Sequence, residues 1–124
     1  MNDGERPHVW TGHLVLHGAD PERSARFYEA IGMRRVALLP NAAIMELRGG
    51  THLVVRMAEE TTGGPAPFDL MVDDLHETRR RWEEAGLAVS MPSRDELDIH
   101  DVFTVTDPDG NIILVNNSHV VGPV

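Results

Sequence analysis

The sequence predicts an α+β fold in which two βαβββ modules follow one another within a single domain. Three observations predict this fold: the sequence repeats itself, each copy passes from a strand pattern into a helix pattern, and strand patterns follow each helix. The first copy is GHLVLHGADPERSARFYEAIGM, from Gly12 to Met33, and the second is PFDLMVDDLHETRRRWEEAGL, from Pro67 to Leu87. Equivalent residues such as Asp20 and Asp74 lie 54 positions apart without a gap, which indicates two homologous modules.

The first strand of each module is predicted by apolar residues at alternate positions before the repeated aspartate. Leu14 and Leu16 occupy these positions in the first copy, and Phe68 and Leu70 occupy them in the second. Alternation with a period of two places such side chains on one face of a strand. We expect this face to pack against the helix.

The helix that follows each strand is predicted by its two ends. Asp20 and Asp74 are N-cap residues, whose carboxylates accept hydrogen bonds from free backbone N–H groups. Pro21 occupies the first helical position, where its missing N–H group costs nothing. Gly32 and Gly86 end the helical patterns, because glycine readily adopts the positive φ of a C′ residue.

Three further strands are predicted after each helix. Turn signals separate them, and the strongest is DPDGN at 107–111, before the last strand. The expected strands are 34–39, 42–47 and 51–57 in the first module and 88–92, 101–106 and 111–116 in the second. Residues 1–124 therefore form one domain, with module one at about 11–57, a linker at about 58–66 and module two at about 67–117.

The composition restricts the functions that this domain can have. The formal net charge is −9, from 11 basic and 20 acidic residues, which argues against nucleic acid and anionic membranes as partners. Because cysteine is absent, disulfides, thiolate nucleophiles and zinc–thiolate sites are excluded. The start of the chain lacks a secretory signal, and no apolar run approaches the roughly 18 residues of a membrane span, so we expect a cytoplasmic protein.

The motifs resemble those of the vicinal-oxygen-chelate superfamily, which includes glyoxalases, bleomycin-resistance proteins and extradiol dioxygenases. The likeness is carried by HLVLHGADPERSARFYEAIGM at 13–33, FDLMVDDLHETRRRWEEAGL at 68–87 and FTVTDPDGNIILV at 103–115. The resemblance implies that each module forms a strongly curved half-sheet, and that two modules form an open cup with the helices outside. It also implies a small ligand or a divalent metal ion in the cup, which is often shared across a homodimer.

Strand alternation predicts which side chains face this cup, because they lie opposite the apolar, helix-facing positions. From the side chains on that face we select as candidates for substrate binding His17, Arg56, Met71, Thr104, Leu114 and Asn116. On the same basis His100 faces the cup from the start of the seventh strand, and we expect it to act as an acid or base.

The resemblance implies one metal ligand from the first strand and one from the last strand of each module, usually His or Gln with Glu. His13 and His52 occupy these positions in module one, and imidazole binds Zn, Ni, Mn or Fe. Pro67 and Leu114 occupy them in module two and offer no ligand atom. Asp69 lies on the same strand face as Pro67 and could complete a facial triad. The predicted metal ligands are therefore His13, His52 and Asp69.

Two functions remain open, and the sequence favours the first over the second. The first is a metal-dependent, glyoxalase-like lyase or isomerase, in which the metal stabilises an enolate or oxyanion of a small oxygen-bearing metabolite, and His100 or Asp69 moves a proton. The second is a metal-free, bleomycin-resistance-like protein that sequesters a cationic drug. The missing ligands and the charge of −9 favour sequestration, whereas an aromatic content of 5% argues against it. A homodimer is expected, because an open curved sheet exposes strand edges.

Overall fold

The first module folds as the sequence predicts. The computed structural model describes residues 4–124, and residues 1–3 of the expected domain lie outside this range. The elements of module one are β1 (His13–Gly18), α1 (Pro21–Ala30), β2 (Arg34–Leu39), β3 (Ala42–Glu46), the short 3₁₀ helix η1 (Arg48–Gly50) and β4 (His52–Met57). These bounds confirm the three expected strands after the helix to within one residue.

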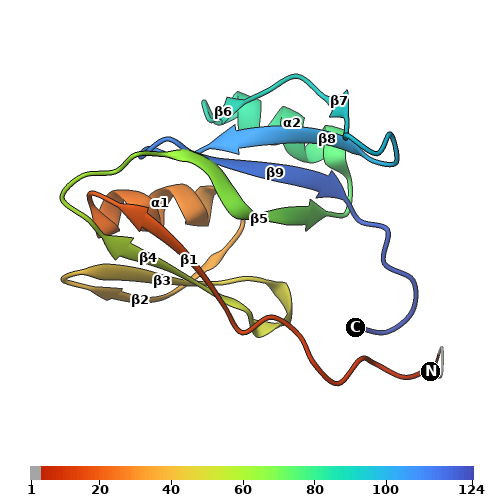
Figure 1. Cartoon of the computed structure of the whole chain (residues 1–124), viewed down its shortest axis with the longest axis horizontal. Coiled ribbons are helices and arrows are strands. Elements are labelled where there is room, and N and C mark those ends of the chain that lie inside the picture. Colours follow the sequence, from red (N-terminus) through yellow and green to blue (C-terminus); the bar gives the residue numbers. More distant parts are fainter. Residues whose placement is uncertain (1–3) are drawn as a thin grey trace.

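The second module repeats the pattern with one additional short strand. Its elements are β5 (Gly64–Val72), α2 (Leu75–Glu84), β6 (Ala88–Val89), β7 (Ser93–Arg94), β8 (Asp101–Thr106) and β9 (Asn111–Asn117). The strand order is β1-β4-β3-β2 in the first sheet and β5-β9-β8-β6 in the second sheet, where β7 also pairs with β8 (Figure 1). The predicted α+β fold of two βαβββ modules is confirmed.

Two expected boundaries in module two are wrong. The strand expected at 88–92 ends at Val89, because the side chain of Ser90 accepts the N–H of Thr104 and Pro92 has no N–H to donate. The linker expected at 58–66 is shorter than predicted. Strand β5 starts at Gly64 inside it, since this residue already pairs with β9 before the register shifts.

The helix ends follow the predicted chemistry. Asp20 accepts hydrogen bonds from the backbone N–H groups of Glu22 and Arg23 at the start of α1. Asp74 accepts one from Glu77 at the start of α2. Beyond each helix a glycine has the positive φ that ends it, 109° in Gly32 and 82° in Gly86.

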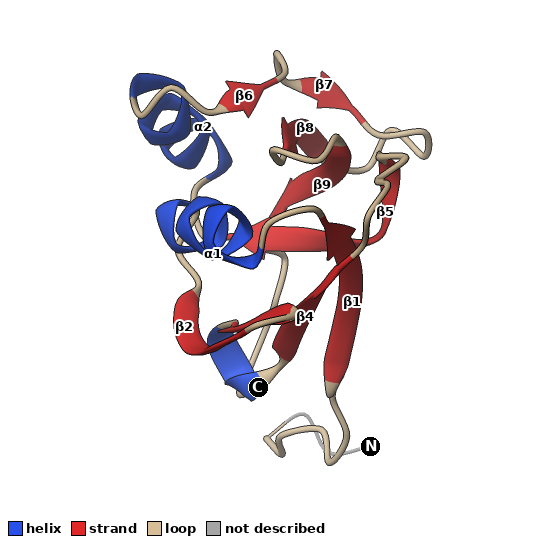
Figure 2. Cartoon of the chain, turned by 90° about the vertical axis from the view of Figure 1, so that its left-hand side faces the viewer, coloured by secondary structure: helices blue, strands red, loops and turns tan. Residues whose placement is uncertain are grey.

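The two modules share one hydrophobic core. Helix α1 packs against β2, β3 and β4, and α2 packs against β6, β8 and β9. Both views show α1 between the two sheets, so within one chain this helix does not lie outside as expected, because it fills the core that the modules share (Figure 2). The largest side chains that are fully buried in this core are Tyr28, Phe103, Met45, Leu53, Leu75 and Ile113. In the described range 4–124, none of the helices combines the length and the apolar character needed to cross a bilayer.

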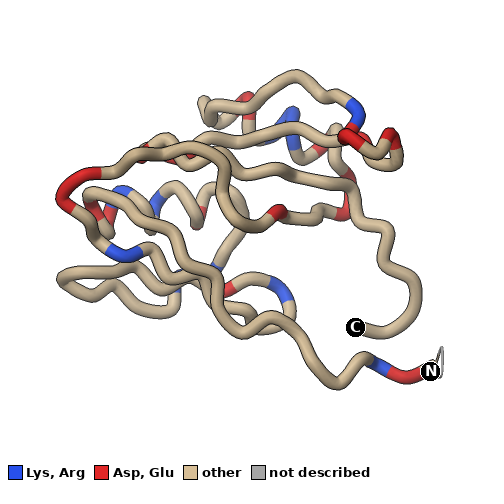
Figure 3. Tube along the Cα trace, viewed as in Figure 1, with Lys and Arg blue, Asp and Glu red and all other residues tan. Residues whose placement is uncertain are grey.

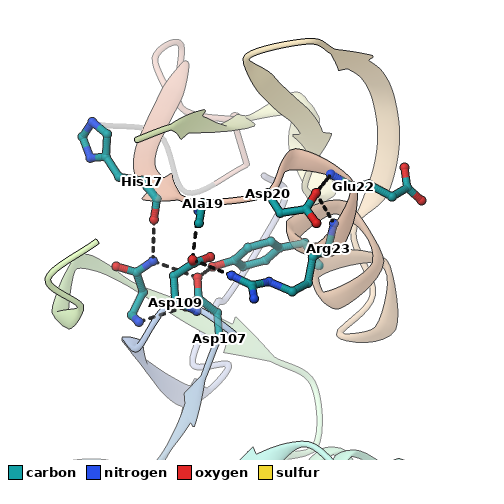
Figure 4. Close-up of polar contacts among 9 residues, drawn as sticks. His17, Ala19, Asp20, Glu22, Arg23, Asp107 and Asp109 are labelled. Carbon is teal, nitrogen blue, oxygen red and sulfur yellow. Dashed lines mark hydrogen bonds and ion pairs between the residues drawn. The ribbon is translucent and has the colours of Figure 1, made fainter. Parts of the chain in front are cut away.

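A buried polar network joins the turn between β8 and β9 to the first module (Figure 4). Asp107 accepts a hydrogen bond of 2.7 Å from the hydroxyl of Tyr28, whose pKa is raised by burial and by this carboxylate. Asp109 accepts bonds from the backbone N–H of Ala19 at 2.9 Å and from the guanidinium of Arg23 at 2.8 Å. The network therefore ties module two to α1 and to the end of β1.

Replacing Gly18 by alanine tests how closely this network is packed. A Cβ atom at Gly18 would lie 2.7 Å from Oδ2 of Asp109 and 2.7 Å from Oγ of Ser24. We expect Gly18→Ala to lower the free energy of unfolding by about 1–3 kcal/mol in urea denaturation, because the buried groups must move. Gly12→Ala is the matched control, since nothing lies within 4 Å of its added Cβ. Equal stability of the two variants would contradict the prediction.

Candidate functional site

Two of the three predicted metal ligands lie side by side. His13 begins β1, His52 begins β4, and the parallel pairing of these strands places them directly opposite each other. Their imidazole rings are 5.9 Å apart between centroids and meet edge to face. The next residue along β4, Leu53, is fully buried against the helix side. The histidines thus occupy the opposite face of the sheet, as strand alternation predicts.

Glu46 extends this pair into a row across the sheet. It lies opposite His52 on β3, and its Oε2 is 3.0 Å from Nε2 of the imidazole. The other oxygen of Glu46 forms an ion pair with Arg34, which lies opposite it on β2. The sequence prediction missed Glu46. Pairing the strands on either side of the turn at 48–50 would have placed it beside His52.

Asp69 does not join the two histidines within one chain. It lies on β5 in the second sheet, where its Oδ2 accepts a hydrogen bond of 2.7 Å from Nδ2 of Asn116. Among residues 4–124, no group of three or more His, Asp or Glu side chains is arranged to hold a metal ion. The donors of a single described chain therefore do not fit the predicted facial triad.

The candidates from module two are neighbours on one face of the second sheet. In register, Leu114 on β9 lies between Asp69 on β5 and Thr104 on β8. Met71 lies opposite the buried Asn116 and is itself 49% exposed. The face thus combines an exposed thioether and an aliphatic side chain with a carboxylate that is already hydrogen-bonded to an amide.

His100 lies just before β8, in a loop that is closed by its own contacts. Its Nδ1 is 2.7 Å from Oδ2 of Asp95, and its ring centroid is 4.8 Å from that of His119. The backbone N–H of Ile99 and the imidazole of His100 lower the pKa of Asp95 to about 2. The sequence prediction missed Asp95, which anchors His100 to the loop.

A crevice of about 440 Å³ opens where the end of β1 meets the start of β5. Val15 and His17 of β1 line one side, and Pro65 and Pro67 of β5 line another. The linker between β4 and β5 contributes the polar side chains of Glu60, Thr61 and Thr62. Of the predicted substrate-binding residues, His17 lines this crevice, and Pro67 forms part of its wall in place of a metal ligand.

The turn between β8 and β9 contacts both sides of the crevice. Asn111, at the start of β9, also lines the crevice, and its Nδ2 donates a hydrogen bond of 3.0 Å to the backbone oxygen of His17. Gly63 of the linker has a φ of +66°, and a Cβ there would lie 2.8 Å from the backbone oxygen of Gly110. The linker and the turn are thus in close backbone contact.

Comparison with known proteins identifies the family. The model of the Glyoxalase/Bleomycin resistance protein/Dioxygenase superfamily matches residues 10–115. The chain belongs to this superfamily. A probable trivalent organoarsenical cleaving enzyme from Bacillus subtilis (strain 168) is 30% identical over 111 residues, which cover 80% of this chain and 73% of that protein.

Solved structures of superfamily members share the fold. A member from Sphaerobacter thermophilus DSM 20745 has a TM-score of 0.75 at 20% identity and covers 89% of this chain and 98% of its own. A bleomycin-binding protein in complex with bleomycin has a TM-score of 0.70 at 21% identity, covering 90% and 99%. An antibiotic-binding protein from Streptomyces sp. CB03234 has a TM-score of 0.71 at 22% identity, covering 91% and 98%.

Asp95 predicts a pH dependence of stability. Its pKa is lowered from 3.8 to about 2 in the folded chain, so its contribution is complete above pH 3.8 and is lost as the pH falls towards 2. We expect Asp95→Asn to be less stable than the wild type near neutral pH, and the difference to shrink below pH 3.8. Urea denaturation at a series of pH values measures this, with the exposed Glu96→Gln as control. A difference independent of pH would count against the prediction.

Proposed function

We propose that this superfamily member binds a small organic molecule in the crevice between β1 and β5, and that it sequesters this molecule without converting it. The observation that supports the proposal best is the lining of the crevice. The apolar residues Val15, Pro65 and Pro67 line it together with the polar residues Glu60, Thr61 and Thr62. Binding sites for small molecules commonly combine a mainly apolar wall with a few polar groups that orient the ligand.

The cysteine content of this chain argues against arsenical cleavage as its function. Bleomycin-binding and antibiotic-binding proteins share the fold, although this likeness extends to the fold alone. The relative from Bacillus subtilis is named for trivalent organoarsenicals. Trivalent arsenic is a soft centre that prefers thiolate ligands, and this chain contains no cysteine. The chain therefore lacks the thiolate ligands that such a substrate prefers.

Replacing Val15 by aspartate tests the binding site. N-phenyl-1-naphthylamine, a neutral apolar dye, fluoresces when it leaves water for an apolar site. We expect the wild type to bind this dye and Val15→Asp to bind it about tenfold more weakly, because a contact of an aliphatic side chain is lost. Val36→Asp is the matched control, since Val36 is an exposed valine of β2 in the same sheet and does not line the crevice.

Equal weakening by both variants would show that the dye binds elsewhere. Absence of dye binding to the wild type would contradict the proposed site.

A second candidate function is a metal-dependent, glyoxalase-like lyase or isomerase. The adjacent imidazoles of His13 and His52 favour it, because two histidines on neighbouring strands supply half of a common metal site. The third ligand would be Asp69 of the partner subunit in a homodimer, since the donors of one described chain do not suffice. A bound Zn, Ni, Mn or Fe ion would act as a Lewis acid on the oxygen atoms of a substrate.

Metal analysis separates the two functions. Under the second candidate, protein dialysed against nickel or zinc should retain one ion per chain, and His13→Ala or His52→Ala should lose it. His76→Ala is the control, because His76 lies exposed on α2. Sequestration predicts that dye binding is the same with and without EDTA and that no stoichiometric ion is retained.

A homodimer is part of the second candidate and is compatible with the first. Strand β1 is an edge strand of its sheet, and edge strands often pair between subunits. We propose a dimer on this basis, and a cytoplasmic location on the basis of the sequence. Light scattering that shows only a monomer near 13.7 kDa would exclude a metal site shared between subunits.

A further inference from the structure

We infer that Arg56 binds an anionic group of the ligand at the rim of the crevice, so that the preferred ligand is a small organic anion with an apolar body. This inference rests on the proposed function and adds the charge class of the ligand to it.

Arg56 lies next to the crevice by strand register and is not itself one of the residues that line it. Arg56 on β4 lies directly opposite His17 on β1 in the parallel pairing, and His17 lines the crevice. Neighbouring strands are about 4.8 Å apart, a distance that an arginine side chain easily spans. The preceding residue, Val55, is buried against the helix side, so Arg56 lies on the opposite face together with Val54.

The charge of Arg56 is not used elsewhere in the described chain. All 11 basic residues are arginines, and nine of them form ion pairs with acidic residues of the same chain. Arg56 forms no ion pair or side-chain hydrogen bond with any residue of the range 4–124, although Glu59 and Glu60 follow it in the sequence. Figure 3 shows acidic residues on the connection between β4 and β5. Although the chain has 20 acidic residues, the guanidinium of Arg56 is thus available to bind an external anion.

The surroundings of Arg56 define the rest of the ligand. Val15 and Val54 lie opposite each other on β1 and β4. Each precedes His17 or Arg56 by two residues and so lies on the same face of the sheet. An apolar group lying on these valines would carry its anionic substituent towards Arg56. A guanidinium holds carboxylate, sulfonate or phosphate oxygens through two parallel N–H donors. Because the net charge of −9 and the carboxylate of Glu60 in the crevice repel anions, the attraction must come from a direct contact with Arg56.

Two dyes that differ by one sulfonate group test this inference. 8-Anilinonaphthalene-1-sulfonate has the same apolar body as the neutral dye N-phenyl-1-naphthylamine. We expect the wild type to bind the sulfonate roughly two- to fivefold more tightly than the neutral dye, the range that one exposed ion pair provides. Arg56→Gln should abolish this preference and leave the affinity for the neutral dye unchanged. Arg56→Lys should keep part of it.

The control variant is Arg26→Gln, which removes an exposed arginine of α1 that pairs with Glu22. It should change neither affinity, and circular dichroism should show all variants folded. Equal binding of the two dyes by the wild type, or a preference that survives Arg56→Gln, would overturn the role of Arg56. A preference for a cationic dye over the neutral one would overturn the inference in favour of a cationic ligand. Failure of every dye to bind would instead contradict the proposed function itself.

Discussion

The hydrogen bonds accepted by Asp107 and Asp109 are the constraint on which the arrangement of the two modules depends. Both carboxylates are buried, and a buried carboxylate is costly unless it is hydrogen-bonded. Tyr28 and Arg23 of α1 and the backbone N–H of Ala19 donate to these carboxylates across the modules, and Asp107 also accepts from residues of its own turn. The contacts to module one position the turn between β8 and β9 against it. Asn111 leaves the same turn and reaches the backbone of His17, so the crevice shares this constraint. The polar network therefore places the candidate site while the shared core supplies the stability.

The two sheets differ in what they present on the faces opposite their helices. The first sheet carries a polar row of His13, His52 and Glu46 at one end and Arg56 at the other. The imidazole of His52 contacts Glu46, and Glu46 also forms an ion pair with Arg34. The carboxylate of this row therefore already has partners within the sheet. Asp69 of the second sheet is likewise engaged by an amide. Arg56 is the contrasting case, because the same sheet leaves its charge without a partner in the described chain.

The repeat allowed most of the fold to be predicted, because aspartate caps, positive-φ glycines and strand alternation act over a few residues. The same alternation correctly placed His13 and His52 on one face, and the register of β1 with β4 makes them neighbours. Contacts that depend on tertiary geometry were beyond the sequence patterns. Strand alternation assigns a face to Asp69, but the angle between the sheets decides whether it meets the histidines. The crevice was missed for the same reason, since its linker residues acquire neighbours only after the modules dock.

Pro67 occupies a position where the family resemblance implies a metal ligand, and its ring lines the crevice instead. Strand β5 is an edge of its sheet, and proline is tolerated there because an edge strand need not donate every N–H. Pro65 and Pro67 together remove two donors from this edge, which discourages pairing with a foreign strand. Their rings lie on the crevice, where a rigid apolar surface loses no side-chain entropy when a ligand covers it. A histidine at 67 would suit a metal, whereas a proline suits an organic ligand, and it is the proline that this chain carries.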